Sequence, residues 1–529
     1  MNQILCQIAH RSYLIKKNIL EDKFVIASSV ALPVFGSNPN TCSDNGVNVW
    51  LDGEFYNRSE FTEGSISDER LLLSVYKKEG LVPFLKNVDG IFCAVIYDSS
   101  KKKIYLISDR YGLKNLYFCK NGHDLFWSSE IKSFSLFPIK SIDIDTDSVK
   151  DFFSVGHFLE NRTWVKGVEL ISPASIVTFD INTSSLVRKT YWNWDQIPVS
   201  THIDINETVN ILKTRFCESV KKRCSKFAKT GLSLSGGLDS RAIFAAMPSK
   251  TEPIPAFTFG KRNCDDIRIA KKVALLRKSK HHIFEIDSKN WLNNRVEGVW
   301  LTDGQFNIIH MHGIEHIEII HTLLDIELNG FLGDAFLGGS YCARNKNEIE
   351  LFNNRGRRFI NMGLVFSNSF YHTRIPFFDN KFLETVMSIP IHLRKDSRIY
   401  KTMLLSAFPE YFRSIPWQKT SLPISHTGFL WQTAEKGLKI VSRLKGMIRC
   451  TSSYADYQAW IRTSDSKELF FRTLINKNAL INNFIDPGVI RSDLERHLSG
   501  GNRSEVLGLY LTFELWMQRF LNKKMKPDI

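Results

Sequence analysis

The segment "SLSGGLDSRA", residues 233 to 242, limits most strongly what this chain can fold into. An apolar, strand-like run precedes it, and apolar residues recur at helical spacing after it, through Ile243 and Met247. A strand that turns through two glycines into a helix is typical of an α/β domain. We expect such a turn to direct backbone N–H groups outward, where they can meet a ligand.

The chemistry of this turn indicates a phosphate that is bound through a metal ion. Glycine lets the backbone approach an anion, and the N-terminus of the following helix attracts that anion. The carboxylate of Asp239 would repel a phosphate directly, so its natural role is to hold a Mg²⁺ ion that bridges to the phosphates. The segment is neither a Walker A loop nor a dinucleotide fingerprint. A plain Gly-Gly turn with a helix-capping Asp or Ser stays open as the alternative.

A second acidic turn follows the apolar stretch "LNGFL", where Asp334 lies among glycines. If both turns lie at the carboxyl edge of one parallel sheet, Asp239 and Asp334 can share one Mg²⁺ ion.

The pattern of elements changes near residue 195, which predicts two domains. Up to that point we expect short strands joined by Gly, Asp, Asn and Ser turns, with helices near 67–80 and 146–156. The stretch "YWNWDQIPVSTHIDINETVN" is the expected crossing, and strands alternate with helices behind it. The predicted domains are residues 1–195 and 196–529.

Composition excludes several classes of protein. The formal net charge is +15, but Lys and Arg are spread along the chain, so a nucleic-acid partner is not expected. The apolar runs fall short of the roughly 20 residues that span a bilayer, and the start lacks the layout of a signal peptide. Nine cysteines without C-x-x-C spacing argue against a disulfide framework and a structural zinc site. We therefore expect a cytoplasmic protein without a membrane span.

Several motifs, in order along most of the chain, resemble the asparagine synthetase family. In the first half these are "LDGEFYN", "VDGIFCAVIYDSSKKKIYLISDRYGLKNLYF" and "FWSSEIKSF". In the second half they are "SGGLDS", "AFTFGKRNCDDIRIAKKVA", "GFLGDAFLGGSY", "TRIPFFDNKFLETVMSIP" and "IPWQKTSLP". The resemblance implies an α/β multidomain protein. Its expected parts are an N-terminal Ntn-hydrolase-like αββα sandwich and an ATP-pyrophosphatase domain with a parallel sheet and a helical C-terminal part.

The resemblance also implies ATP and Mg²⁺ as cofactors and assigns residues to them. Lys419 is the expected lysine at the α-phosphate during adenylation, acting with Asp239 and Asp334. The residues expected to hold ATP and pyrophosphate are Leu232, Ser235, Gly236, Gly237, Leu238, Asp239, Ser240, Phe257, Thr258, Phe259, Gly260 and Gly333. Phe257 and Phe259 could instead belong to a core strand. Lys419 could instead be a surface lysine. Arg374 and Asp379 could belong to the active site or could equally form a structural ion pair.

The second half departs from the family pattern at the acceptor site. Phe331 stands where the family has the acid of G-E-G-x-D, and a phenylalanine cannot accept a proton from an incoming amine. His310 and His312 are possible substitutes, although packed or surface histidines are equally open. His372 stands where the family commonly has Glu. We therefore expect a rebuilt acceptor pocket.

The first half departs at the nucleophile. An Ntn amidotransferase needs a cysteine whose own α-amine is free, but Asn2 and Gln3 stand where that cysteine belongs. The first cysteine is Cys6, in a segment that resembles a strand of the family. Asp52 replaces the family's Asn, while Gly53 and Asp109 remain. We expect the glutaminase to be lost, unless removal of residues 1–5 exposes Cys6.

Three functions follow. The first is an ATP-dependent ligase that adenylates a small-molecule or peptide carboxylate and transfers it to ammonia or an amine, as lasso-peptide cyclases and β-lactam synthetases in this family do. The second is glutamine-hydrolysing asparagine synthesis. The third is a non-catalytic nucleotide-binding protein. A homodimer is an open expectation.

Overall fold

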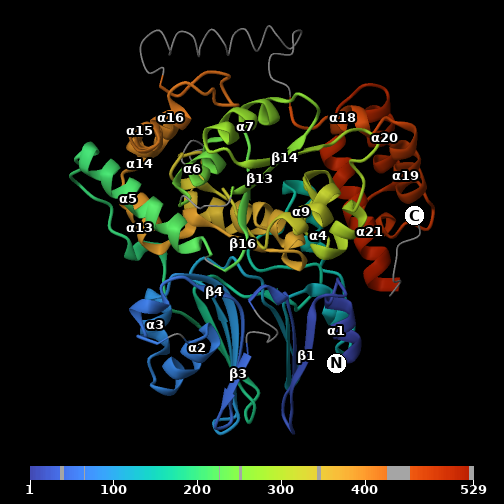
Figure 1. Ribbon diagram of the computed structural model, residues 1–529. Helices are drawn as coiled ribbons and strands as arrows, with labels where there is room; N and C mark the ends of the chain where they lie inside the picture. The colour runs from blue at the N-terminus through green and yellow to red at the C-terminus, as the bar shows by residue number, and fades with distance from the viewer. Residues whose placement is uncertain are drawn as a thin grey trace.

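The computed structural model describes residues 1–35, 41–64, 66–225, 227–248, 253–341, 347–425 and 453–522. A β-rich N-terminal part lies at one end of the molecule and a larger part, with a parallel sheet and many helices, at the other (Figure 1). Within the described residues, no helix is both long and apolar enough to cross a membrane.

The N-terminal part is built from antiparallel strands. The six-stranded sheet has the order β11-β10-β6-β5-β4-β3, and the smaller sheets are β1-β2 and β8-β7-β9. The strands are β1 (Ile15–Glu21), β2 (Ile26–Ala31), β3 (Thr41–Asp44), β4 (Val47–Phe55), β5 (Gly90–Asp98), β6 (Lys103–Ser108), β7 (Tyr117–Asn121), β8 (Asp124–Ser128), β9 (Glu169–Leu170), β10 (Ser175–Asp180) and β11 (Ser185–Thr190). Every residue of β5 is buried, since the sheet is covered on both faces.

Helices cover the outer faces of these sheets. They are α1 (Asn2–Ile8), α2 (Asp68–Lys77) and α3 (Leu81–Asn87), whereas a fourth helix, α4 (Thr146–Val155), packs against the C-terminal part. Leu71, Leu72 and Leu73 of α2 pack against one face of the six-stranded sheet. Trp50, Val95 and Leu106 fill a separate core on its other face, with residues of the smaller sheets. This layering agrees with the expected αββα sandwich.

The second part contains a five-stranded parallel sheet in the order β14-β13-β12-β15-β16. Its strands are β12 (Thr230–Ser233), β13 (Pro255–Gly260), β14 (Lys280–Glu285), β15 (Ile326–Leu328) and β16 (His372–Arg374). The helices up to residue 365 are α5 (Ile205–Arg223), α6 (Leu238–Ala246), α7 (Asp265–Leu276), α8 (Arg295–Leu301), α9 (Ile317–Leu323), α10 (Gly333–Phe336), α11 (Glu348–Leu351), the π-helix η8 (Phe352–Ile360) and α12 (Met362–Val365). The parallel sheet and the strand–turn–helix at residues 230–246 confirm the sequence prediction.

The remaining helices form the C-terminal part. They are α13 (Asn380–Ser388), α14 (Ile391–Arg394), α15 (Arg398–Ala407), α16 (Pro409–Phe412), α18 (Tyr457–Trp460), α19 (Ser464–Leu474), α20 (Pro487–Leu498) and α21 (Ser504–Asn522). Helix α21 packs against α4, which comes from the first 195 residues (Figure 1). Trp516 of α21 stacks on Trp164 with ring centres 5.3 Å apart. The two parts therefore share a hydrophobic core.

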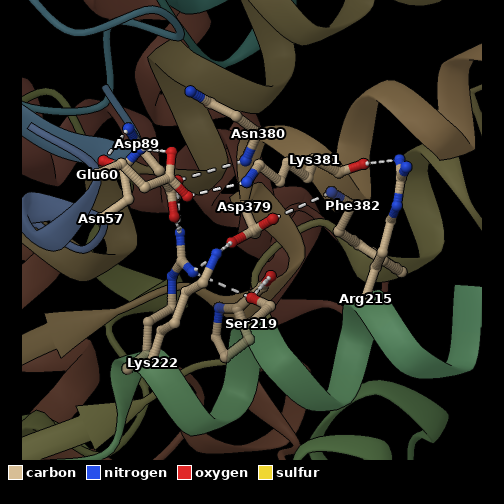
Figure 2. A network of polar contacts seen from close by, with 12 residues as sticks. Asn57, Glu60, Asp89, Arg215, Ser219, Lys222, Asp379, Asn380, Lys381 and Phe382 are labelled. Atoms are coloured by element: carbon tan, nitrogen blue, oxygen red, sulfur yellow. Dashed lines mark hydrogen bonds and ion pairs between the residues drawn. The ribbon is translucent and has the colours of Figure 1, made fainter. Parts of the chain in front are cut away.

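Buried charges also join the two parts. Arg223, at the end of α5, donates to Asp89 at 3.0 Å and to Asp379 at 3.2 Å, and all three side chains are at most 5% exposed. Figure 2 shows Asp89 and Asp379 facing each other within this network. Arg374 of β16 pairs with Glu54 of β4, with Nε to Oε1 at 3.0 Å. These contacts set the position of the parallel sheet relative to the N-terminal strands.

Candidate active site

The candidate site lies where the order of the parallel sheet reverses. From β12 the chain first adds β13 and β14 on one side, and then adds β15 and β16 on the other side. The loops that leave β12 and β15 therefore separate at the carboxyl edge of the sheet, which is where α/β folds open a binding crevice. Helix α6 follows β12 and helix α10 follows β15. Asp239 and Asp334 lie in the first turns of these two helices.

The two aspartates are in direct contact. The backbone N–H of Asp334 donates to Oδ2 of Asp239 at 3.0 Å, and the Tyr400 hydroxyl donates to its Oδ1 at 2.7 Å. A Cβ on Gly333 would lie 2.7 Å from Cγ of Asp239, so glycine is required for α10 to approach this closely. Burial, together with the nearby Asp334 carboxylate, raises the pKa of Asp239 to about 7.

A cavity of about 460 Å³ opens in front of these carboxylates. It is lined by Gly237, Leu238, Asp239, Asp334, Tyr400, Trp417, Gln418, Lys419, Ser453 and Tyr454. Five of these residues, Gly237, Leu238, Asp239, Asp334 and Lys419, are among those assigned from the sequence. The structure thus brings together the expected metal ligands, the expected lysine and the N-terminus of α6.

The backbone amides of the glycine turn are arranged differently from our expectation. The N–H of Gly236 donates to Oδ1 of Asp266 at 2.8 Å, and the N–H of Ser235 donates to Oγ of Ser240 at 3.1 Å. The N–H of Gly237 donates to Oγ of Ser235 at 3.2 Å. These three amides therefore hold the turn in shape instead of facing a ligand. No side chain caps the N-terminus of α6, whose first-turn amides remain for an anion.

Lys419 belongs to a loop that closes over the turn. The N–H of Gln418 donates to the carbonyl of Gly236 at 3.2 Å, and its side-chain amide donates to Asp266 at 3.1 Å. Lys419 is exposed, and its Nζ lies 5.3 Å from the ring centre of Trp417. Nζ of Lys401 lies 5.4 Å from the same ring. Cation–π contact with Trp417 places the Lys419 ammonium at the edge of the cavity.

The two carboxylates fit a magnesium ion. Mg²⁺ prefers oxygen ligands and in nucleotide sites uses one or two carboxylates together with phosphate oxygens. Asp239 and Asp334 supply such a pair, from adjacent loops and beside a cavity. In the part of the chain that the structure describes, no group of three or more His, Cys, Asp or Glu side chains gathers as a protein-only metal site.

Other residues assigned to the nucleotide lie beside the cavity instead of lining it. Phe257 is 2% exposed and packs in a core with Phe284, which is the core-strand alternative. Leu232 is also fully buried. The Thr258 hydroxyl lies 2.8 Å from Nε2 of His281. Phe259 is half-buried and stacks on His312, and Gly260 ends β13 with φ at +154°.

The departures from the family pattern also have places in the structure. Phe331 is 4% exposed and packs on Phe378, with ring centres 5.6 Å apart. His310 pairs with Glu505 at 2.9 Å, away from the cavity. His372 lies on β16, where burial lowers its pKa to about 4. Asp379 caps α13 through the N–H of Phe382 and pairs with Arg223, a structural role.

The expectation that Cys6 lies on a strand is wrong. Residues Asn2–Ile8 form α1, in which Cys6 is exposed and its nitrogen is part of the helix backbone. Asp52, which replaces the family's Asn, forms an ion pair with Lys114, with Nζ to Oδ1 at 2.9 Å. The buried carboxylate of Asp109 accepts N–H bonds from residues 111, 113 and 114. Asp109 therefore shapes the turn at residues 109–114.

Sequence reasoning missed several residues that line or support the cavity, because they come from distant elements. Tyr400 lies on α15, and Asp266 is in the first turn of α7. Trp417 and Gln418 directly precede the predicted lysine, so their proximity to Lys419 in sequence could have indicated them. No feature of the sequence indicates Ser453 or Tyr454.

Comparison with known proteins agrees with this division. A family model described as a glutamine amidotransferase domain matches residues 2–192, and one described as asparagine synthase matches residues 212–351. Glutamine-hydrolyzing asparagine synthetase 2 of Bacillus subtilis (strain 168) is 22% identical over 333 residues, which cover 58% of this chain and 44% of that protein. Amidase chyE of Penicillium rubens is 28% identical over 226 residues, which cover 41% of this chain and 33% of that protein. The chain thus aligns with less than half the length of either relative.

A solved structure is similar only in part. Glutamine phosphoribosylpyrophosphate amidotransferase from B. subtilis, complexed with ADP and GMP, is 12% identical with a TM-score of 0.20, over 47% of this chain and 64% of that one. The N-terminal part has the Ntn-type fold of glutamine amidotransferases, which the family model supports. Both family models match in this order on one chain, and they cover well over half of it. The chain is a divergent member of the asparagine synthetase family.

Proposed function

We propose that this protein is an ATP-dependent amide-forming ligase that adenylates a carboxylate. A carboxylate oxygen attacks the α-phosphorus of ATP, the bond to the bridging oxygen breaks, and pyrophosphate leaves with that electron pair. Ammonia or an amine then attacks the acyl carbon, and AMP and a proton are released. The observation that carries this proposal is the contact between Asp239 and Asp334 at one cavity, at the point where the strand order reverses.

The residues around the cavity have separate roles in this reaction. Bound Mg²⁺ would neutralise phosphate charge, with Asp239 and Asp334 as its ligands. The N-terminus of α6 favours a negatively charged phosphate. Lys419 lies at the cavity edge, where its charge can stabilise the negative charge that develops on the departing pyrophosphate.

We further propose that the N-terminal part no longer supplies ammonia from glutamine. Cys6 lies within a helix, and Lys114 holds Asp52 by an ion pair. A nucleophile that uses its own α-amine as base needs that amine free. The proposed domains are residues 1–195, retained as a structural part, and residues 196–529, which carry the synthetase site.

The adenylation proposal is tested by pyrophosphate release from Mg·ATP with a panel of carboxylates and an ammonium salt. Asp334→Asn should lower the rate about 10²- to 10⁴-fold, because it removes a metal ligand from the transition state. Asp465→Asn, at the exposed start of α19, is the matched control and should keep the wild-type rate. An unchanged rate in Asp334→Asn would show that Asp334 is not a metal ligand.

The loss of glutaminase is tested separately. We expect product with ammonium or an amine and no glutamate release from glutamine. Intact mass and N-terminal sequencing of the purified protein establish whether Cys6 is ever the first residue. Glutamate release that disappears in Cys6→Ala, from a chain that begins at Cys6, would return this protein to glutamine-hydrolysing asparagine synthesis.

A further inference from the structure

One residue that lines the cavity is a tyrosine without an assigned role. Tyr454 lines the cavity, and its backbone carbonyl accepts a hydrogen bond from the N–H of Lys261 at 2.8 Å. Lys261 directly follows β13, which lies on the opposite side of β12 from β15. The cavity therefore extends from the aspartates, between β12 and β15, to Tyr454 beside β13.

A chain of hydrogen bonds leads from a buried cation to this tyrosine. Nη2 of Arg295, whose side chain is fully buried, donates to the hydroxyl of Tyr457 at 2.8 Å. The Tyr457 hydroxyl lies 2.7 Å from Nδ1 of His312. Nε2 of His312 lies 2.9 Å from the hydroxyl of Tyr454.

The direction of this chain follows from the chemistry of its members. A guanidinium group only donates, so the Tyr457 hydroxyl accepts from Arg295 and keeps its own hydrogen available to donate to Nδ1 of His312. Burial and the charge of Arg295 keep the pKa of His312 well below its ordinary value, so the ring is neutral. A neutral ring that accepts at Nδ1 carries its hydrogen on Nε2 and donates to Tyr454. Among the described residues, the structure provides no protein acceptor for the hydrogen of the Tyr454 hydroxyl itself.

We propose that Tyr454 is a nucleotide-binding residue whose hydroxyl donates a hydrogen bond to the nucleoside half of ATP, with His312 and Tyr457 as positioning residues that set its direction. This inference rests on the proposed function, which places the phosphates at Asp239, Asp334 and Lys419. With the phosphates at that end, the ribose and base extend toward β13. A neutral donor suits the uncharged oxygens and ring nitrogens of a nucleoside. Phe259, which stacks on His312 at 6.2 Å, supports the ring that orients Tyr454.

The test compares two ligands that differ only in the nucleoside. Equilibrium binding of Mg·ATP and of Mg·tripolyphosphate is measured by calorimetry on wild-type protein and on Tyr454→Phe. The variant keeps the aromatic ring and removes the donor. We expect ATP to bind about three- to tenfold more weakly, which corresponds to one neutral hydrogen bond, and tripolyphosphate to bind equally well. Tyr510→Phe is the matched control, since it removes a buried hydroxyl that donates to Asp493, outside the cavity.

A second readout tests the direction of the relay without any nucleotide. Nitrogen-15 chemical shifts of His312, assigned with a His312→Gln variant, should show hydrogen on Nε2 and none on Nδ1, and Tyr457→Phe should change this state. ATP affinity that is unchanged in Tyr454→Phe, or that falls equally for both ligands, overturns the inference. A hydrogen on Nδ1 in the wild-type protein overturns the relay. Wild-type protein that binds ATP but releases no pyrophosphate contradicts the proposed function alone, whereas wild-type protein that binds no ATP contradicts both.

Discussion

At the residue scale, the site stores unfavourable electrostatics in the absence of metal. Asp239 is buried beside Asp334, and its raised pKa, about 7, means that the folded protein holds a proton that the unfolded chain releases near pH 4. Because the folded state then binds more protons, the free energy of unfolding decreases as pH rises from about 4 to about 7. Binding of Mg²⁺ would remove the charge repulsion between these two neighbouring carboxylates.

We predict that Asp239→Asn is more stable than wild type, although it removes a proposed metal ligand. Asp239→Asn, measured without metal, should gain about 1 to 2 kcal/mol over wild type at pH 8, and this gain should vanish near pH 4. Calorimetric melting in EDTA at both pH values provides the comparison, with Asp465→Asn as the surface control. Equal or lower stability of Asp239→Asn at pH 8 would show that burial and the Asp334 carboxylate do not raise the pKa of Asp239.

Lys419 is predicted to act on the transition state more than on ATP binding. Lys419→Ala should lower pyrophosphate release about 10²- to 10³-fold with little change in ATP affinity, because its charge matters as the leaving group develops. Lys401→Ala is the matched control, since Lys401 faces the same Trp417 ring without lining the cavity. A variant at Lys419 that mainly loses ATP affinity would instead make it a binding residue.

At the element scale, close contact between strands β4 and β5 depends on one glycine. Gly53 has φ at +121°, and a Cβ there would lie 2.0 Å from the carbonyl oxygen of Ile91. Gly53→Ala should destabilise the protein by more than about 2 kcal/mol, because both the backbone conformation and the space forbid a side chain. Urea denaturation measures the loss.

Gly122 is the matched control for this prediction. It also has positive φ, at +62°, but lies in the β7–β8 turn with nothing within 4 Å of a Cβ. Gly122→Ala should therefore cost only about 1 kcal/mol, the cost of the left-handed conformation alone. Equal losses in the two variants would show that the strand contact at Gly53 relaxes without cost.

At the scale of the whole molecule, buried charges hold the two parts together. Arg223→Met leaves the carboxylates of Asp89 and Asp379 buried without their guanidinium and should destabilise the protein by about 3 to 5 kcal/mol. Lys381→Met is the control, because its ion pair with Glu60 bridges the same two parts from an exposed position (Figure 2) and should cost at most about 1 kcal/mol.

Thermal melting of both variants, with probes in each part, measures the difference. If Arg223→Met melts like Lys381→Met, the buried network does not couple the two parts. If the N-terminal part lacks glutaminase activity, as proposed, its stabilisation of the second part would be a reason to retain it.

Local sequence was sufficient for the parts of the site that local chemistry determines. The strand, the Gly-Gly turn and helix α6 follow from apolar spacing and turn residues, and the pairing of Asp239 with Asp334 follows from their positions after two parallel strands. The proposed loss of glutaminase activity also started from local sequence, since Asn2 and Gln3 precede Cys6. These features depend on residues within about ten positions of each other, or on a sheet topology that such segments imply.

Only the tertiary structure decided which distant side chains complete the site. Asp266 takes the Gly236 amide, Tyr400 binds Asp239, and Tyr454 reaches the cavity more than two hundred residues after the turn. Residues 6–10 resemble a strand of the family, but Cys6 lies in a helix that spans residues 2–8. The physical reason is that these outcomes depend on contacts between elements far apart in sequence, and such contacts leave no periodicity or spacing in the chain itself.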